Sequence, residues 1–181
     1  MSQVLIIDDE EKITRILKEA LTAEGYEVET RPSAEDALPV IEEGGADIIL
    51  CDLRLGGMDG LELLGHIKSI EPNTEVIIIT GHGDIPMSVQ AMKKGAIDFL
   101  SKPFDDDELL DAVKVALLKN LQARVNLNEK KHIMQRIGSL TAREHEILTY
   151  LITGMLNKQI AYELKISERT VKAHRKKVFD K

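Results

Sequence analysis

The chain has 181 residues, of which 43% are hydrophobic and 30% are charged. This composition is typical of one ordinary globular domain followed by a small second one. No apolar run reaches the roughly 18 to 20 residues of a membrane span. The first residues also lack the basic start and apolar core of a signal peptide, so we expect a cytoplasmic protein without membrane contact. The single cysteine, Cys51, excludes an internal disulfide and is expected to be a small buried hydrophobe.

The net charge of −7 is divided unevenly along the chain. Residues 137–181 carry nine Lys and Arg against five Asp and Glu, which leaves −11 for residues 1–136. A basic tail on an acidic protein favours binding to a polyanion, because neutralising phosphates drives nucleic-acid binding of any sequence.

Short apolar runs rich in Val, Ile and Leu predict buried parallel strands in the first 120 residues. The segments between them keep helical spacing: Ile13, Leu17 and Leu21 lie on one face, and Gly25 ends that helix. Five β/α repeats predict an α/β fold with a five-stranded doubly wound parallel sheet. The expected strands are Val4 to Asp8, Glu27 to Arg31, Ile48 to Cys51, Glu75 to Thr80 and Ile97 to Ser101. The expected later helices are Ala34 to Glu43, Gly60 to Ser69, Pro86 to Lys94 and Asp106 to Leu118.

One long helix is predicted from residue 105 to about 136, because no Pro or Gly interrupts the sequence before Gly138. Its apolar positions begin with Leu109, Leu110 and Val113, and polar residues dilute them after Leu121. They do not sustain the clean heptads of a coiled coil, so a dimer seam here stays an open alternative.

The basic tail has the pattern of a helix-turn-helix. Thr141 and Glu144 form a capping box ahead of an apolar helix that ends at Gly154. A short helix over residues 157–164 and a tight turn follow, and Ser167 is positioned to cap a third, cationic helix.

The predicted strands deliver five side chains suited to phosphoryl chemistry. In a parallel sheet the carboxyl ends of the strands share one edge, where ligands bind. Three clustered carboxylates favour a divalent cation, and oxygen ligands with retained water suit Mg²⁺. The central Asp52 is the expected nucleophile, with a lysine and a hydroxyl to stabilise the transferring oxygens. The five side chains are Asp8, Asp9, Asp52, Thr80 and Lys102.

The motifs IIDDEE, DLRLGGMDG, IIITGHGD and DFLSKPF resemble the receiver domain of bacterial two-component response regulators, which has a flavodoxin-like fold. The resemblance implies that Asp52 is the phosphoacceptor, that Asp9 ligates Mg²⁺ directly and that Asp8 acts through water. It further implies that the backbone carbonyl of Arg54 ligates the metal. Thr80 is implied to be a switch hydroxyl and Lys102 the phosphate partner.

Further positions match this family or depart from it. Phe99 resembles an aromatic ring that turns inward when Thr80 moves, and the Lys102-Pro103 peptide bond is expected to be cis. Gly56 and Gly57 replace the usual Pro-Gly, so a less stiff loop after the acceptor strand is expected. We expect His82 to be an exposed loop residue.

The tail is similar to the LuxR/FixJ class of DNA-binding domain. The resemblance implies that Val171 and Val178 anchor the recognition helix. That family continues into a fourth helix that pairs two DNA-binding domains. Since the sequence stops at Lys181, we expect a truncated chain or pairing through the receiver alone, with weaker DNA binding either way. The implied base-facing residues are Lys172, Ala173 and Lys176, and those near phosphates are Asn157, Lys158, Thr170, His174 and Arg175.

The sequence thus predicts a receiver domain over residues 1–120, a helical linker over 121–137 and a helix-turn-helix domain over 138–181. The predicted function is a response regulator in which a sensor histidine kinase phosphorylates Asp52 and thereby controls promoter binding. We expect a homodimer on phosphorylation, possible contact with RNA polymerase, and no enzymatic activity beyond the receiver's own phosphoryl transfer. One alternative is a tail that binds RNA or a protein. A haloacid dehalogenase-type phosphatase is disfavoured because Arg54 stands where it needs an acid.

Overall fold

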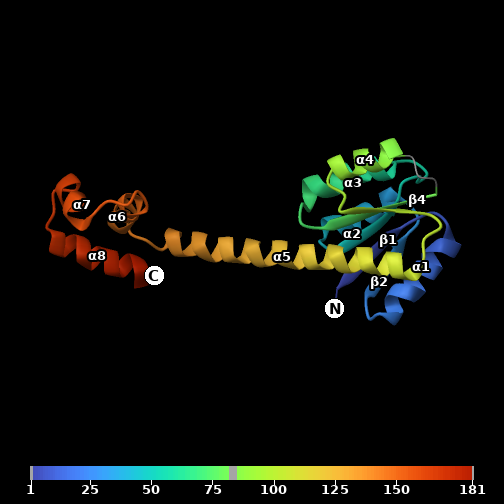
Figure 1. Cartoon of the computed structure of the whole chain (residues 1–181), viewed down its shortest axis with the longest axis horizontal. Helices are drawn as coiled ribbons and strands as arrows, with labels where there is room; N and C mark the ends of the chain where they lie inside the picture. The colour runs from blue at the N-terminus through green and yellow to red at the C-terminus, as the bar shows by residue number, and fades with distance from the viewer. Residues whose placement is uncertain (1, 82–84, 181) are drawn as a thin grey trace. The chain divides into compact units, whose positions relative to one another are not determined.

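The computed structural model describes residues 2–81 and 85–180, which form two compact units, Met1–Arg124 and Val125–Lys181 (Figure 1). His82, expected to be an exposed loop residue, lies outside the described residues. Each unit is considered by itself. None of the helices in the described parts has the length and hydrophobicity of a membrane-spanning segment.

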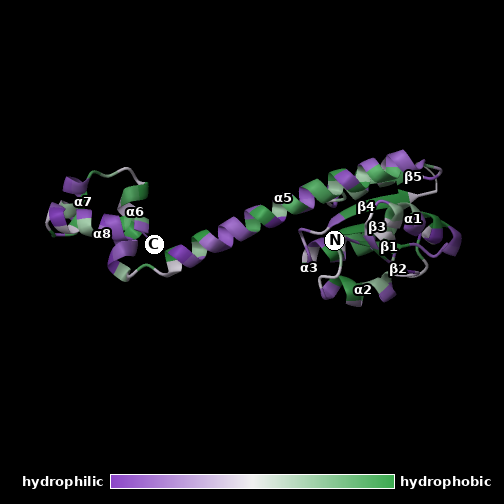
Figure 2. Ribbon diagram, turned by 90° about the horizontal axis from the view of Figure 1, so that it is seen from below, coloured by the Kyte–Doolittle hydropathy of each residue, from purple (hydrophilic) through white to green (hydrophobic). Residues whose placement is uncertain are grey.

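The first unit is built on a parallel five-stranded sheet with the strand order β2-β1-β3-β4-β5. This confirms the predicted doubly wound α/β fold. The central strands β3 and β4 are buried along their whole length, as expected for strands covered by helices on both faces. Figure 2 shows these strands as the hydrophobic centre of the unit. The strands are β1 (Gln3–Ile7), β2 (Glu27–Arg31), β3 (Ile48–Asp52), β4 (Glu75–Thr80) and β5 (Asp98–Ser101).

Helices cover both faces of the sheet and create two hydrophobic cores. One core lies between the sheet and α2, α3 and α4, and the other between the sheet and α1 and α5. Cys51 is fully buried in the first core, as predicted, and burial raises the pKa of its thiol. The element ends lie within about two residues of the predicted ones, an ordinary difference for fraying termini. The helices are α1 (Glu11–Ala23), α2 (Ala34–Glu42), α3 (Gly60–Ile70), α4 (Ile85–Lys93) and α5 (Asp106–Gly138).

Helix α5 is a single helix of 33 residues, which confirms the predicted long helix. Its first turns bury an apolar stripe that includes Leu109 and Val113. The side chains from residue 125 to residue 136 are exposed. The apolar face weakens after that first stripe, since Leu121 is already 48% exposed. A dimer seam in this part of α5 stays an untested alternative.

A polar cluster that the sequence analysis missed fastens α5 to the amino edge of the sheet. Asn120 is only 3% exposed, and its side-chain amide donates to the carbonyls of Asp47 (3.2 Å) and Asn73 (2.9 Å). The Arg124 guanidinium lies 2.5 Å from the Asp47 carboxylate. At the start of β4, the buried Glu75 carboxylate lies 3.5 Å from the Lys119 ammonium. We call this cluster the basal clamp; its members are Asp47, Glu75, Lys119, Asn120 and Arg124.

The second unit contains three short helices after the end of α5: α6 (Ala142–Ile152), α7 (Asn157–Glu163) and α8 (Glu168–Asp180). The predicted capping box is present, with Thr141 and Glu144 exchanging hydrogen bonds at the start of α6. The Ser167 hydroxyl accepts a hydrogen bond from the Thr170 amide and caps α8, also as predicted. Val171 and Val178 are buried, which confirms that these side chains anchor α8.

Candidate functional site

The carboxyl edge of the sheet gathers the five side chains that the sequence singled out. Asp8 and Asp9 follow the last residue of β1, Asp52 ends β3, Thr80 ends β4 and Lys102 follows β5. Because all five strands are parallel, these strand ends meet at one edge, opposite the basal clamp.

One ammonium group is shared by two buried carboxylates at this edge. The Lys102 Nζ atom lies 2.8 Å from Asp8 Oδ2 and 2.9 Å from Asp52 Oδ1. Asp8 and Asp52 are 3% and 6% exposed, so their negative charges are largely removed from water. Two buried carboxylates repel each other unless a cation lies between them, and Lys102 provides that cation.

The second oxygen of each carboxylate accepts a backbone hydrogen bond. Asp8 Oδ1 accepts from the Glu10 amide, and Asp52 Oδ2 accepts from the Arg54 amide, both at 2.8 Å. The Glu10 carboxylate also approaches Lys102, at 3.5 Å, although it is mostly exposed. The sequence analysis missed Glu10; its position directly after the two aspartates was the only signal that could have indicated it.

Burial and hydrogen bonding shift the pKa of Asp52, and also that of Lys102, in opposite directions. Burial raises the pKa of the Asp52 carboxyl above its ordinary value, and it outweighs the hydrogen bonds from Lys102 and the Arg54 amide, which lower it. Burial lowers the pKa of Lys102, but hydrogen bonds to Asp8 and Asp52 outweigh burial and raise it overall. The lysine is therefore held charged beside a carboxylate whose charge is costly.

Thr80 and Phe99 lie on the neighbouring strands β4 and β5, next to the site formed by Asp52 and Lys102. Thr80 is 2% exposed, and its carbonyl accepts a hydrogen bond of 2.6 Å from the Lys102 amide, which joins the ends of β4 and β5. Phe99 is half-buried and packs against the core under α2, α3 and α4. The Lys102-Pro103 peptide bond is cis, as predicted.

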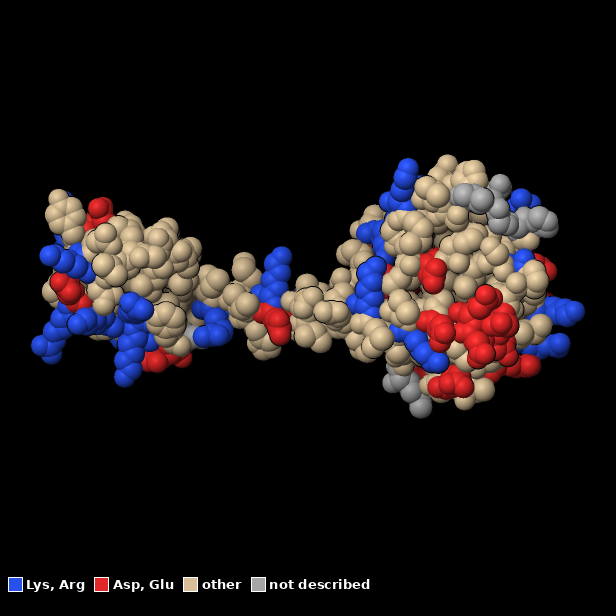
Figure 3. All heavy atoms as spheres, in the orientation of Figure 1, with Lys and Arg blue, Asp and Glu red and all other residues tan. Residues whose placement is uncertain are grey.

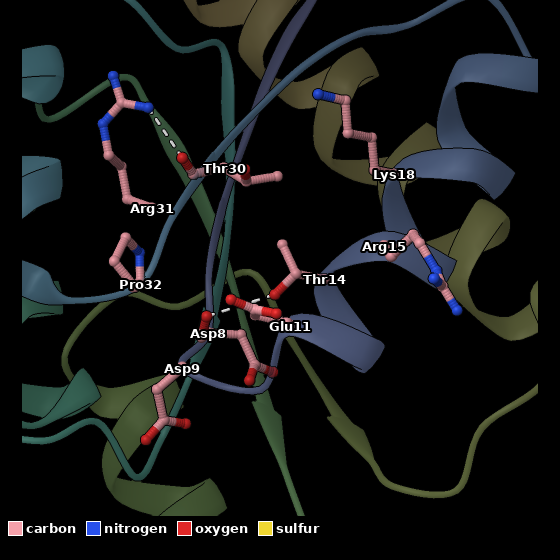
Figure 4. Close-up of a pocket in the computed structure, with 9 residues that line it drawn as sticks. All are labelled: Asp8, Asp9, Glu11, Thr14, Arg15, Lys18, Thr30, Arg31 and Pro32. Atoms are coloured by element: carbon pink, nitrogen blue, oxygen red, sulfur yellow. Dashed lines mark hydrogen bonds between the residues drawn. The ribbon is translucent and has the colours of Figure 1, made fainter.

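A cleft of about 380 Å³ lies between α1 and β2, beside Asp8 and Asp9 at the carboxyl edge of the sheet. In Figure 4 the side chains of Asp8, Asp9 and Glu11 gather on one side of it, and Arg15 and Lys18 extend from α1. The Thr14 hydroxyl donates to the Asp8 carbonyl at 3.3 Å and ties the first turn of α1 to the end of β1. Asp9 is exposed and therefore accessible from the solvent.

The donor set fits a hydrated magnesium ion. No three His, Cys, Asp or Glu side chains form a closed metal cluster within residues 2–81 and 85–180. Mg²⁺ does not need one, because it takes one or two carboxylates and keeps several waters. The available oxygens are the buried carboxylates of Asp8 and Asp52, the exposed carboxylate of Asp9 and the backbone carbonyl of Arg54.

The second unit presents a cationic helix. In Figure 3, lysine and arginine side chains gather over α8, whereas acidic side chains gather on one side of the first unit. Four of the implied DNA contacts are exposed: Lys158, Lys172, Ala173 and Lys176. Within residues 2–81 and 85–180, the three lysine side chains make no hydrogen bond or ion pair.

Three of the other implied DNA contacts, Asn157, Thr170 and Arg175, make side-chain hydrogen bonds within the domain. The Arg175 guanidinium donates to Asn157 Oδ1 at 3.2 Å and lies 5.7 Å from the centre of the Phe179 ring, so it braces α8 against the start of α7. The Thr170 hydroxyl lies 2.8 Å from that of Ser167. His174 is half-buried, and its Nδ1 atom is buried without a hydrogen-bond partner among the described residues.

A doubly wound sheet with a shared lysine between two buried aspartates, followed by a helix-turn-helix, defines the class of phosphorylation-controlled regulators. Residues 4–114 match the response regulator receiver domain, and residues 138–181 match the luxR family of bacterial regulatory proteins. The chain belongs to the response regulators that combine a receiver with a LuxR-type DNA-binding domain. It is a DNA-binding transcriptional regulator of the two-component class.

Relatives match over nearly the whole chain. The transcriptional regulatory protein FixJ of Rhizobium meliloti is 39% identical over 178 residues, which cover 98% of this chain and 87% of that protein. The response regulator protein TodT of Pseudomonas putida is 37% identical over 180 residues, covering 99% and 79%. A low-resolution structure of the response regulator StyR has a TM-score of 0.84 at 39% identity and covers 99% of this chain and 90% of that one.

Proposed function

We propose that Asp52 is the phosphoacceptor of this receiver. One carboxylate oxygen of Asp52 attacks the phosphorus of a phosphohistidine on a sensor kinase, or of a small acyl phosphate. A bond from oxygen to phosphorus forms as the bond to the leaving nitrogen or oxygen breaks, and the leaving group keeps the electron pair. The observation that carries this proposal is the Lys102 ammonium, 2.9 Å from Asp52 and 2.8 Å from Asp8.

Lys102 and Thr80 are proposed to stabilise the transferring group. The ammonium, 2.9 Å from Asp52 Oδ1, can move its contact to a phosphoryl oxygen, because transfer puts that oxygen on the Asp52 side chain itself. The Thr80 hydroxyl at the end of β4 can donate to another phosphoryl oxygen. Such preorganised donors are among the largest contributions to catalysis at a buried site.

Asp8, Asp9, Asp52 and the Arg54 carbonyl are proposed to hold Mg²⁺. When bound, the ion supplies positive charge that balances the phosphoryl oxygens during transfer. The Arg54 amide fixes the start of the loop that carries this carbonyl, through its 2.8 Å hydrogen bond to Asp52.

Phosphorylation is proposed to change the surface formed by α4 and β5. It adds a charge of about −1.5 to −2, and a shift from 1% to 99% active needs roughly 5.5 kcal/mol of differential stabilisation. Thr80 and Phe99 are proposed to transmit this change. A groove of about 550 Å³ between α4 and β5 is lined by Phe99, and by Val89 and Met92, which are 46% and 48% exposed. We propose that two phosphorylated receivers pair over this groove.

The output is proposed to be promoter binding through α8. Lys172, Ala173 and Lys176 are exposed for base contacts, and Lys158 for a phosphate contact. Contact with RNA polymerase and a cytoplasmic location belong to the same proposal, since both follow from regulating transcription. The predicted alternative, a tail that binds RNA or a protein, is decided by the experiment below.

The test compares binding to double-stranded promoter fragments and to RNA of the same length, over a range of salt concentrations. Each is measured with and without beryllofluoride and Mg²⁺, in the wild type and in Asp52→Asn. The proposal expects beryllofluoride to cause dimerisation and tighter DNA binding in the wild type alone. Equal binding to RNA, or an equal response in Asp52→Asn, would contradict it.

A further inference from the structure

The loop between β3 and α3 carries the Arg54 carbonyl and departs from the family at Gly56 and Gly57. Its first residues are well fixed: Leu53 and Leu55 are buried, and the Leu53 amide donates to the Ile79 carbonyl at 2.8 Å. Its far end is fixed by the capping box of Asp59 and Glu62 at the start of α3. The two glycines between these anchors have no side chain with which to pack.

A carboxylate from another helix spans this middle section. Glu35, in the first turn of α2, accepts a hydrogen bond of 3.1 Å from the Met58 amide. A Cβ atom built on Gly57 would lie 2.7 Å from Glu35 Oε1, so the carboxylate lies directly against the Gly57 backbone. Gly57 has a φ of +97°, a conformation in which a side chain is strained. Glycine at this position therefore permits both the turn and the close approach of Glu35.

We propose that Glu35 is a positioning residue for the phosphoryl-transfer site. It holds the Gly57–Met58 backbone and thereby fixes the part of the loop in which two glycines offer no side chain for packing. The loop then presents the Arg54 carbonyl in the place where Mg²⁺ is proposed to bind. This inference rests on the proposed function for the role of that carbonyl, but the tie between Glu35 and the loop does not.

The ionisation of Glu35 agrees with this role. Hydrogen bonds from its own backbone amide and from the Met58 amide lower the pKa of Glu35 below its ordinary value. Glu35 is therefore a carboxylate at neutral pH, and an ionised acceptor makes a stronger hydrogen bond to an amide than a neutral one.

The chain offers a matched control one residue away. Asp36 is also exposed, carries the same charge and lies in the same first turn of α2. The Ser33 hydroxyl lies 2.8 Å from Asp36 Oδ2, and among the described residues Asp36 makes no hydrogen bond or ion pair with the β3–α3 loop. Asp36→Ala therefore removes an equal charge from the same helix end without removing the tie.

The first measurement is amide hydrogen exchange of the full chain without Mg²⁺, in the wild type, Glu35→Ala, Glu35→Gln and Asp36→Ala. Glu35→Ala should raise the exchange rate of the Met58 amide about tenfold, because that amide loses its acceptor, whereas Asp36→Ala should leave it unchanged. Glu35→Gln keeps an acceptor oxygen and should remain near the wild type. Equal exchange at the Met58 amide in the wild type and Glu35→Ala would overturn the proposal.

The second measurement is phosphorylation by acetyl phosphate as a function of Mg²⁺ concentration. Glu35→Ala should raise the half-saturating Mg²⁺ concentration about tenfold, the low end for a group that supports a metal ligand, with the rate at saturation unchanged. Glu35→Gln should restore most of the affinity. An unchanged Mg²⁺ dependence in Glu35→Ala would overturn the proposal, whereas a wild type that takes no label on Asp52 would refute the proposed function and leave the exchange result standing.

Discussion

The two edges of the receiver sheet both bury charged groups, but they use them differently. At the amino edge, the Asp47 carboxylate accepts from the Gln3 amide (3.0 Å) and from Arg124, and the buried Glu75 lies between Lys68 and Lys119. At the carboxyl edge, Asp8 and Asp52 share the single ammonium of Lys102. In the basal clamp, Asp47 and Glu75 each have cationic partners of their own. At the carboxyl edge, Asp8 and Asp52 share one cation.

This difference separates a structural network from a reactive one. Hydrogen bonds and ion pairs to several elements stabilise one arrangement, and the basal clamp accordingly fixes α5 to the sheet up to Arg124. Buried charges that share a partner leave room for another ion or a phosphoryl group to compete for it. Substitutions at the amino edge should therefore change stability, and those at the carboxyl edge should change chemistry.

Lys102→Met should have the largest effect, because it removes the cation that Asp8 and Asp52 share. Phosphorylation by acetyl phosphate should fall by at least about 100-fold. The unpaired buried carboxylates should also cost about 3 kcal/mol of unfolding free energy at neutral pH. Lys114→Met serves as the control, because the Lys114 side chain is 56% exposed and its ion pair, 3.8 Å from Nζ to Asp111 Oδ1, lies at the surface. A Lys102→Met protein with normal labelling would contradict the role of the shared cation.

Asn120→Leu tests the basal clamp. The Asn73 carbonyl loses the donor it has at 2.9 Å, so the unfolding free energy should fall by about 2 kcal/mol in urea titrations. The phosphorylation rate should stay within about twofold of the wild type. Asn128→Leu, at an exposed position in the same helix, is the control and should change stability by less than about 0.5 kcal/mol. Loss of phosphorylation in Asn120→Leu would show that the two edges are not separate.

Asp52→Asn should change the pH dependence of stability. The pKa of the Asp52 carboxyl is higher in the folded than in the unfolded chain, mainly because of burial. Below the ordinary Asp pKa of about 3.9, Asp52 is protonated in both states and does not change the free energy of unfolding. As the pH rises, ionisation of Asp52 lowers the free energy of unfolding, and the full loss is reached above the pKa of the folded state. Asp52→Asn should be more stable than the wild type at neutral pH, and the difference should vanish near pH 3. Urea titrations across this range check the sign; a variant less stable at pH 7 would contradict it.

The smallest expected changes in stability come from Lys68 and Lys119, the two lysines next to Glu75. The Lys119 side chain is 60% exposed, so Lys119→Ala should cost less than about 0.5 kcal/mol. The Lys68 side chain is 19% exposed and donates to the Thr74 carbonyl at 2.7 Å, so Lys68→Ala should cost about 1 kcal/mol. Thermal unfolding of the two variants checks the order, and the reverse order would mean that exposure does not govern their contributions.

The site at the carboxyl edge could be predicted from the sequence, because each of its five side chains ends an apolar run or directly follows one. Strand direction alone then brings Asp8, Asp52 and Lys102 together, although Lys102 is 94 residues from Asp8. The long helix and the capped tail were equally visible, because helix periodicity and caps are local signals.

The basal clamp and the Glu35 tie could not be predicted in this way. Asn120 looks like one of several polar residues diluting a helix face, and its burial depends on two loops that come from elsewhere in the sequence. Glu35 reaches a residue 23 positions away through a single hydrogen bond. The family resemblance implies a DNA contact for Arg175, but its hydrogen bond to Asn157 could not be predicted, because it depends on the packing of two helices.

The most direct test of the central claim is to locate the phosphoryl group after incubation of the full chain with acetyl phosphate and Mg²⁺. Intact-mass measurement and peptide mapping should find one phosphoryl group, on Asp52, and none in Asp52→Asn. Phosphorylation of Asp8 or Asp9, or unchanged labelling of Asp52→Asn, would contradict the account.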